Sequence, residues 1–278
     1  MLAHHRLVGD MYSAAEYSSW SFDHEVIRLE QRSPVEYAIT RRYLDRLIQP
    51  ESTVADVGVG VGHYSEHLAR RGCCVHLIDV SQRLLDAAVN RLEAAGLSDR
   101  IRGAHCASAT DLRMLADGCC DAVLLLGPLY HLSLASERAR AIAEAARILR
   151  PGGLILAAGI NRLIFMGDAL RNSPNGTVYP LARLQRFLDD GYLDSVDARL
   201  TAAAYLTTAH DFQAELNGVF APVLFTGTES FASRLPEQFL AASPENQEIW
   251  LDLVERTGTT PEGIGAAAHF LYAGRNGR

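Results

Sequence analysis

Apolar and polar residues follow two patterns along this chain. One is typical of buried strands and the other of helices with one buried side. Short, nearly continuous apolar runs bounded by glycine, proline or acidic residues are typical of strands buried on both faces. Between these runs, apolar residues recur every three to four positions, which indicates helices with one buried side. We expect strands at residues 53–57, 74–79, 101–106, 120–126, 154–160, 220–226 and 269–273.

Several helices carry recognisable end signals. Ser81 is expected to cap one helix and Ser136 to cap another over 137–149. Ser33, followed by proline, opens a helix that ends before Pro50. Strands that alternate with helices in this way predict a parallel sheet covered on both faces.

The regular alternation stops after residue 160 and resumes near residue 208, which suggests an insertion. We therefore predict an N-terminal helical cap over 1–50 and a ligand-binding core over 51–160. Residues 161–207 are expected to form a cap or lid insertion, and 208–278 the C-terminal part of the core sheet.

Composition excludes several classes of protein. A formal net charge of −7 and a pI near 5.8 argue against a nucleic-acid partner, because neutralising phosphates needs a basic face. The chain shows neither a long apolar run nor an export leader, so we expect a cytoplasmic protein with no membrane partner. Its oligomeric state is left open.

The sequence contains no lysine and no Cys-x-x-Cys pair. All 26 Lys+Arg residues are arginine, which excludes Schiff-base chemistry, a P-loop lysine and a Tyr-x-x-x-Lys pair. The five cysteines form no Cys-x-x-Cys pair, and no Cys/His spacing suits zinc. We therefore predict no metal site.

The stretch that carries chemistry follows the first strand, where Asp56 precedes glycines at 58, 60 and 62. Glycines at this spacing allow a tight turn against a ligand, and the next helix points free N–H groups at the same place. The second strand ends on Asp79, suited to a ribose diol. This pattern predicts a nucleoside cofactor, although Asp79 could instead be an ordinary helix-preceding carboxylate. Asp56 could hold the turn or touch the ligand.

Together, Asp56, Gly58, Gly60, Gly62 and Asp79 resemble the class I S-adenosylmethionine-dependent methyltransferases. Further matching stretches are 107–112, 121–132 and 148–153, and Gly-Pro-Leu-Tyr-His-Leu at 127–132 narrows the resemblance to a bacterial branch acting on small molecules. It covers 33–160 well and 201–275 loosely. It implies a Rossmann-like α/β fold: a doubly wound, seven-stranded sheet, mostly parallel with an antiparallel last strand, plus a helical cap.

The resemblance also implies roles for residues at the strand ends. The turn at Gly58–Gly62 would pack on the methionine part and ribose of S-adenosylmethionine, and Asp79 would accept hydrogen bonds from the ribose hydroxyls. Val80 would flank the adenine, while Leu126 and Gly127 would line the sulfonium end.

The adenine edge departs from the family pattern. Ala109 would offer its backbone N–H to the adenine, but Ser108 stands where the family usually has an aspartate. A hydroxyl can accept the same hydrogen bond but carries no charge. The two alternatives are a weaker affinity for the cofactor and a water bridge that compensates for the missing charge.

Candidate acceptor-side residues follow the fourth strand and lie in the predicted caps. His131 is a candidate base or acceptor-orienting group beside Tyr130; the alternative is a histidine packed at a helix end. Tyr17 and Trp20 are candidates for enclosing the acceptor; the alternative is that they only pack a cap helix. Tyr205 is a candidate substrate contact.

The predicted function is methyl transfer to a small-molecule acceptor, with the accepting N, O or C atom open. An NAD(P)-dependent oxidoreductase is disfavoured by the Gly-x-Gly-x-Gly spacing, the missing second mononucleotide half and the lack of lysine. A protein that binds S-adenosylmethionine without transferring its methyl group is the other alternative.

Overall fold

A single seven-stranded sheet forms the centre of the computed structural model, which describes residues 22–172, 175, 181–193 and 204–277. The order is β3-β2-β1-β4-β5-β9-β8; the first five strands run parallel, and β9 runs antiparallel to both of its neighbours. The bounds are β1 Thr53–Val57, β2 Cys74–Asp79, β3 Ile101–Cys106, β4 Cys120–Leu125, β5 Leu149–Ile160, β8 Phe220–Gly227 and β9 His269–Asn276. The predicted fold class is confirmed.

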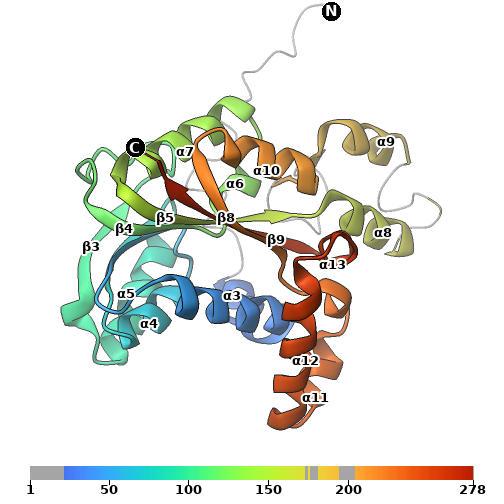
Figure 1. Ribbon diagram of the computed structural model, residues 1–278, viewed down its shortest axis with the longest axis horizontal. Coiled ribbons are helices and arrows are strands. Elements are labelled where there is room, and N and C mark those ends of the chain that lie inside the picture. The colour runs from blue at the N-terminus through green and yellow to red at the C-terminus, as the bar shows by residue number, and fades with distance from the viewer. Residues whose placement is uncertain (1–21, 173–174, 176–180, 194–203, 278) are drawn as a thin grey trace, which may run out of the picture.

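Helices cover both faces of this sheet (Figure 1). One face carries α3 (Pro34–Leu47), α4 (His63–Arg70), α5 (Gln82–Ala94) and α12 (Pro244–Gly258). The other carries α7 (Ala135–Ile148) and α10 (Ala209–Asn217). Side chains alternate between the faces, so Val54 packs into one core and Ala55 into the other. Both cores are apolar, which explains why the strands read as continuous apolar runs.

Several predicted element boundaries were wrong: β9 continues to Asn276, and the starts of α7 and β5 also differ. Ser136 does not cap α7, since the helix begins at Ala135 and Leu134 takes the N-cap position without a side-chain hydrogen bond. β5 begins at Leu149, ahead of the proline–glycine turn, because that turn is absorbed as an irregularity in the pairing with β4. The Ser81 cap is confirmed: its hydroxyl accepts from the Leu84 N–H.

The segment between β5 and α10 leaves the sheet and returns to it. It contains α8 (Arg162–Asn172), α9 (Leu181–Asp190) and the short strands β6 (Tyr192–Leu193) and β7 (Ala204–Tyr205). Thr207 N–H then donates to Ile160 O at 2.9 Å, which brings the end of the segment back beside the end of β5. The predicted insertion thus begins and ends at one point of the sheet edge.

The remaining elements are short. They are α2 (Phe22–Ile27), the π-helical η2 (Arg28–Arg32), η3 (Ser98–Arg100), α6 (Pro128–His131), η4 (Ser230–Ala232), α11 (Pro236–Ala241) and α13 (Pro261–Ala266). α2 and η2 precede α3 and lie near the turn that follows β1.

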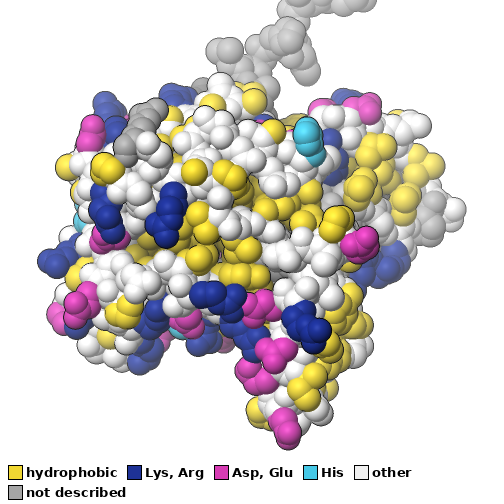
Figure 2. Space-filling model, in the orientation of Figure 1, with side chains coloured by type: hydrophobic (Ala, Val, Ile, Leu, Met, Phe, Trp, Pro, Cys, Tyr) yellow, Lys and Arg dark blue, Asp and Glu magenta, His cyan; other side chains and the backbone are white. Residues whose placement is uncertain are grey.

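Exposed apolar side chains gather on elements away from the sheet. Figure 2 shows them over the α11–α12 projection and over α8 and α9, where half-exposed leucines and isoleucines include Leu163, Leu181 and Ile249. Within the described ranges, none of the helices combines the length and apolarity that crossing a membrane requires.

Candidate active site

The glycine turn after β1 is held against the end of β2. The backbone N–H groups of Gly58 and Val59 both donate to Ile78 O, at 2.8 and 3.0 Å. Gly58, Gly60 and Gly62 have φ angles of 79°, 56° and 84°, a left-handed conformation that other residues rarely adopt. The sequence-predicted turn therefore exists, and its shape requires glycine.

The three glycines face different surroundings. A Cβ on Gly58 would lie 2.8 Å from ring carbons of Pro128, and one on Gly62 would lie 3.1 Å from Ala88. At Gly60, the nearest described atom is Glu25 Oε2, at 3.9 Å. Gly58 and Gly62 are thus fixed by packing, whereas Gly60 faces the side of the turn where a ligand can approach the backbone. The cofactor contact at this turn that the family resemblance implies stays a prediction.

Asp79 lies at the end of β2, and its carboxylate bridges the glycine turn and the start of α5. Its Oδ2 accepts from Gly60 N–H and its Oδ1 from Ser81 N–H, each at 2.9 Å. Burial raises the pKa of Asp79 to about 6, against the lowering effect of these two N–H donors. A buried carboxylate with remaining lone pairs beside an open glycine can accept hydroxyl donors.

Asp56 faces the helix that follows the turn. Ser65 Oγ donates to Asp56 Oδ2 at 2.7 Å, and burial raises the pKa of Asp56 to about 6. The described contact fits the turn-holding interpretation of this residue.

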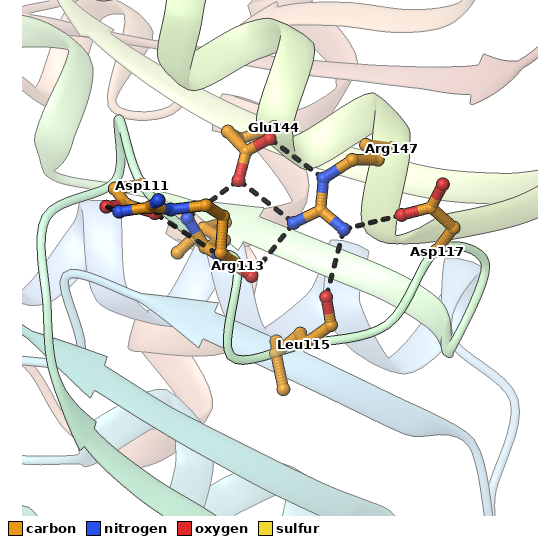
Figure 3. Close-up of polar contacts among 7 residues, drawn as sticks. Asp111, Arg113, Leu115, Asp117, Glu144 and Arg147 are labelled. Atoms are coloured by element: carbon orange, nitrogen blue, oxygen red, sulfur yellow. Dashed lines mark hydrogen bonds and ion pairs between the residues drawn. The ribbon is translucent and has the colours of Figure 1, made fainter.

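The loop after β3 carries Ser108 and Ala109 and is fastened to α7 (Figure 3). Arg147 donates to the carbonyls of Leu112 and Leu115 at 2.8 and 2.9 Å, and Glu144 Oε2 accepts from Leu112 N–H at 2.7 Å. These contacts satisfy backbone groups that no regular element pairs, so they fix the loop's path.

Within this loop, Ser108 is occupied locally. Its Oγ lies 2.9 Å from Thr110 Oγ1 and accepts from Thr110 N–H at 3.2 Å. Ala109 is buried, and Val80, at the end of β2, is half-buried. An open pocket of about 580 Å³ borders the loop, lined by Cys106, Ala107, Ser108, Asp111, Arg113 and Met114. Room for a ligand thus adjoins the predicted adenine end.

The end of β4 approaches the glycine turn from the other side. A Cβ on Gly127 would lie 3.9 Å from Gly58 O, and the Tyr130 hydroxyl donates to Leu126 O at 3.2 Å. Burial raises the pKa of Tyr130 to about 12, so this phenol stays protonated at neutral pH. The ring of His131 lies 4.7 Å from that of Tyr130, between centroids.

The predicted substrate residues are less fully described. Tyr17 and Trp20 lie outside the described residues. Tyr205 is in β7, and the buried Arg138 guanidinium lies 3.5 Å from the centre of its ring while also pairing with Glu215 at 2.8 Å. One face of the Tyr205 ring is therefore covered by an arginine.

Sequence reasoning missed four charged residues near this edge: Glu25, Arg28, Glu36 and His269. Glu36 is 6% exposed, although it is charged and lies in the helix predicted from Ser33. Glu36 lies four positions before Thr40, so both residues are on the buried side of that helix. This spacing is the one signal in the sequence that Glu36 is buried. Glu36, Glu229 and His269 place potential ligand atoms within 4.8 Å of one another, and the prediction of no metal site remains a prediction.

Comparison with known proteins identifies the core. Residues 55–157 match the sequence model of a methyltransferase domain. The chain is 32% identical over 114 residues to the ubiquinone biosynthesis O-methyltransferase of Caulobacter vibrioides, covering 40% of this chain and 42% of that protein. It is 34% identical over 124 residues to methyltransferase GfsG of Streptomyces halstedii, covering 44% and 43%. It is 36% identical over 108 residues to the tRNA (carboxymethyluridine(34)-5-O)-methyltransferase ALKBH8 of Mus musculus, covering 38% of this chain and 14% of that protein.

Solved structures share the fold over nearly the whole chain. The 1,6-didemethyltoxoflavin-N1-methyltransferase of Burkholderia thailandensis, solved with S-adenosylhomocysteine, has a TM-score of 0.60 at 12% identity and covers 100% of this chain and 94% of that one. The [4+2]-cyclase SpnF has a TM-score of 0.55 at 18% identity, with 91% and 94% covered. At these identities the likeness concerns the fold.

Residues 55–157 therefore match a methyltransferase domain, and the chain shares its fold with S-adenosylmethionine-dependent methyltransferases. The chain spans less than half the length of the three curated relatives described above.

Proposed function

We propose that this protein transfers a methyl group from S-adenosylmethionine to a small-molecule acceptor. The observation that carries the proposal is the open side of the turn at Gly60, with the Asp79 carboxylate beside it and Gly127 opposite Gly58. A nicotinamide-dependent oxidoreductase is disfavoured because its sheet is built from two parallel mononucleotide halves, whereas β9 here is antiparallel.

In this proposal the strand ends hold the cofactor. The Gly58–Gly62 turn and the N-terminus of α4 would receive its methionine part and ribose, and Asp79 its ribose hydroxyls. Val80, Ser108 and Ala109 would bound the adenine, with the serine supplying a neutral acceptor already shared with Thr110.

Leu126 and Gly127 would border the reacting end, where the tyrosine hydroxyl fixes the Leu126 carbonyl. S-adenosylmethionine bound there would supply a methyl group on a sulfonium that carries its own leaving group. The chain's task is then to align the acceptor with that methyl group and to exclude water.

His131, on the half-buried helix α6, is our candidate for orienting the acceptor or removing its proton. A base is needed only for a hydroxyl, thiol or acidic carbon. Tyr130 stays protonated at neutral pH, so it would act as a fixed wall and not as the base.

A small acceptor is favoured over tRNA by charge. The chain carries a net charge of −7, and tRNA binding depends on neutralising phosphates. The similarity to the tRNA methyltransferase covers only 14% of the length of that protein.

The test is methyl transfer from labelled S-adenosylmethionine to two separate acceptor pools, a bacterial metabolite extract and total tRNA. We expect label in the metabolite pool and none in tRNA. Label in tRNA would overturn the acceptor class. Tight binding of S-adenosylhomocysteine without transfer to either pool would favour a protein that uses the cofactor for another purpose, as the fold shared with a [4+2]-cyclase allows.

A further inference from the structure

A cluster of charged side chains lies at the same sheet edge, outside the glycine turn. Glu36 comes from α3, Glu229 follows the end of β8, and His269 is the first residue of β9. Because β9 is antiparallel to β5 and β8, its first residue lies where those two strands end, opposite Ile160. The topology therefore brings three residues, far apart in the sequence, to the edge that carries the cofactor turn.

His269 is held between the two glutamates. Its Nδ1 lies 2.5 Å from Glu229 Oε1 and 3.5 Å from Glu36 Oε2, and its backbone N–H donates to Glu229 Oε2 at 3.0 Å. Glu229 and Glu36 are 4% and 6% exposed. Burial alone would lower the pKa of His269, but the two carboxylates outweigh it and raise the pKa to about 9.

The cluster continues to the N-terminal segment formed by α2 and η2. Arg28 Nη1 lies 3.6 Å from Glu36 Oε2, and its Nε lies 3.6 Å from Glu25 Oε2. Arg28 also acts electrostatically on Tyr130 of α6. Glu25 is the described residue nearest to the open side of Gly60. A chain of alternating charges thus runs from β9, through α3, to the turn that receives the cofactor.

The neighbouring cations favour an ion-pair network over a metal site. A divalent ion would have to replace the hydrogen bond between His269 and Glu229, and it would lie close to the Arg28 guanidinium that already faces Glu36. Arg28 begins a π-helical stretch, a geometry found mostly at functional sites. Arg28 and protonated His269 thus supply the positive charge that neutralises these glutamates.

We propose that Glu36, Glu229 and His269 are positioning residues that hold Arg28 and Glu25, and with them the segment of residues 22–32, against the cofactor turn and α6. The catalytic part of this inference rests on the proposed function. The docking of residues 22–32 does not, since it can be measured without any methyl acceptor.

The pH dependence follows from the groups that face His269: Glu36 on α3, Glu229 after β8 and Arg28 on η2. When His269 loses its proton, it no longer repels Arg28, and the guanidinium then faces two buried carboxylates without a competing cation. We therefore expect residues 22–32 to be held more firmly as the pH rises through about 9.

The experiment is hydrogen–deuterium exchange of the full chain, followed over pH and corrected for intrinsic exchange, for wild type, Glu229→Gln and Glu36→Gln. The control is Glu255→Gln, which removes the ion pairs that Arg42 and Arg46 of the same helix α3 make with Glu255 of α12. We expect either cluster variant to speed exchange in residues 22–32 roughly tenfold, and the control to leave it unchanged. Each cluster variant should also move the pH at which protection rises to lower values, since one carboxylate fewer lowers the pKa of His269. A contact with a purely structural role would leave the pH of this change in protection unaltered.

Binding of S-adenosylhomocysteine is measured on the same proteins. Unchanged exchange and unchanged affinity in both cluster variants would overturn the positioning role. If neither variant folds, wild type decides: protection of 22–32 that falls as the pH rises through 9 while α12 stays protected would overturn it, and protection that rises there relative to α12 would support it. Protection that requires Mn²⁺ or Zn²⁺ and disappears with EDTA would replace it with a metal site. A wild-type protein that does not bind S-adenosylhomocysteine would refute the proposed function and leave the exchange result valid.

Discussion

Replacing Asp79 with asparagine is expected to weaken cofactor binding while leaving the fold nearly as stable. The pKa of Asp79 is raised from 3.8 to about 6, so the folded chain disfavours its ionised form by about 3 kcal/mol at neutral pH. A neutral amide avoids that cost. It also leaves one of the two N–H donors, Gly60 or Ser81, without an acceptor, which costs about 1–3 kcal/mol. The two effects nearly cancel in the free energy of unfolding.

In the free energy of cofactor binding, no comparable gain offsets the loss. Two ribose hydroxyls would lose a charged acceptor worth about 1.5–3 kcal/mol, which weakens binding about 10- to 150-fold. Isothermal titration with S-adenosylhomocysteine, together with urea unfolding, measures both quantities. In wild type the affinity should rise between pH 5 and pH 7, as Asp79 with its pKa of about 6 becomes ionised, and the asparagine variant should lack this rise.

Asp56→Asn is the matched control, because burial raises the pKa of Asp56 to the same value and its described partner is Ser65. An asparagine oxygen can still accept from that hydroxyl, so cofactor affinity should change by less than about threefold. If Asp79→Asn keeps wild-type affinity, or if Asp56→Asn loses as much as Asp79→Asn, the assignment of the ribose acceptor is wrong.

Three further outcomes are expected. Gly58→Ala should lower the melting temperature more than Gly60→Ala, since both positions have positive φ but only the first would bring a Cβ within 2.8 Å of Pro128. Gly60→Ala should chiefly weaken S-adenosylhomocysteine binding. Equal melting temperatures of the two variants would contradict this difference. His131→Ala should lower turnover more than cofactor affinity, as steady-state kinetics and titration would show; intact turnover would remove the residue from the proposed chemistry. The folded pKa of His269, about 9, exceeds its unfolded value, so its contribution to stability is complete below pH 6.5 and is lost as the pH rises through 9; urea unfolding should record this decline, and a flat profile would argue against the ion pairs.

Local sequence signals were sufficient for the core. Strands β1, β2 and β3 match their predicted bounds. For β1 and β2 the reason is that a strand buried on both faces is a mostly apolar run bounded by turn residues. The turn at Gly58–Gly62 and the Ser81 cap were also predictable, because each depends on the conformational preference of residues adjacent in the chain. The bounds of β5 were not, since the strand continues through its proline–glycine turn only because β4 lies beside it.

The charged residues around His269 mark the limit of sequence reasoning. By itself, the sequence determined the glycine turn after β1 and the acid that ends β2, because these signals lie within about 25 residues of one another. Only the tertiary structure decided that Glu36, Glu229 and His269 meet beside Arg28, since packing of α3 brings Glu36 to residues more than 190 positions away in numbering. Pairwise electrostatic contact depends on distance in space, and no local pattern of residue types encodes it.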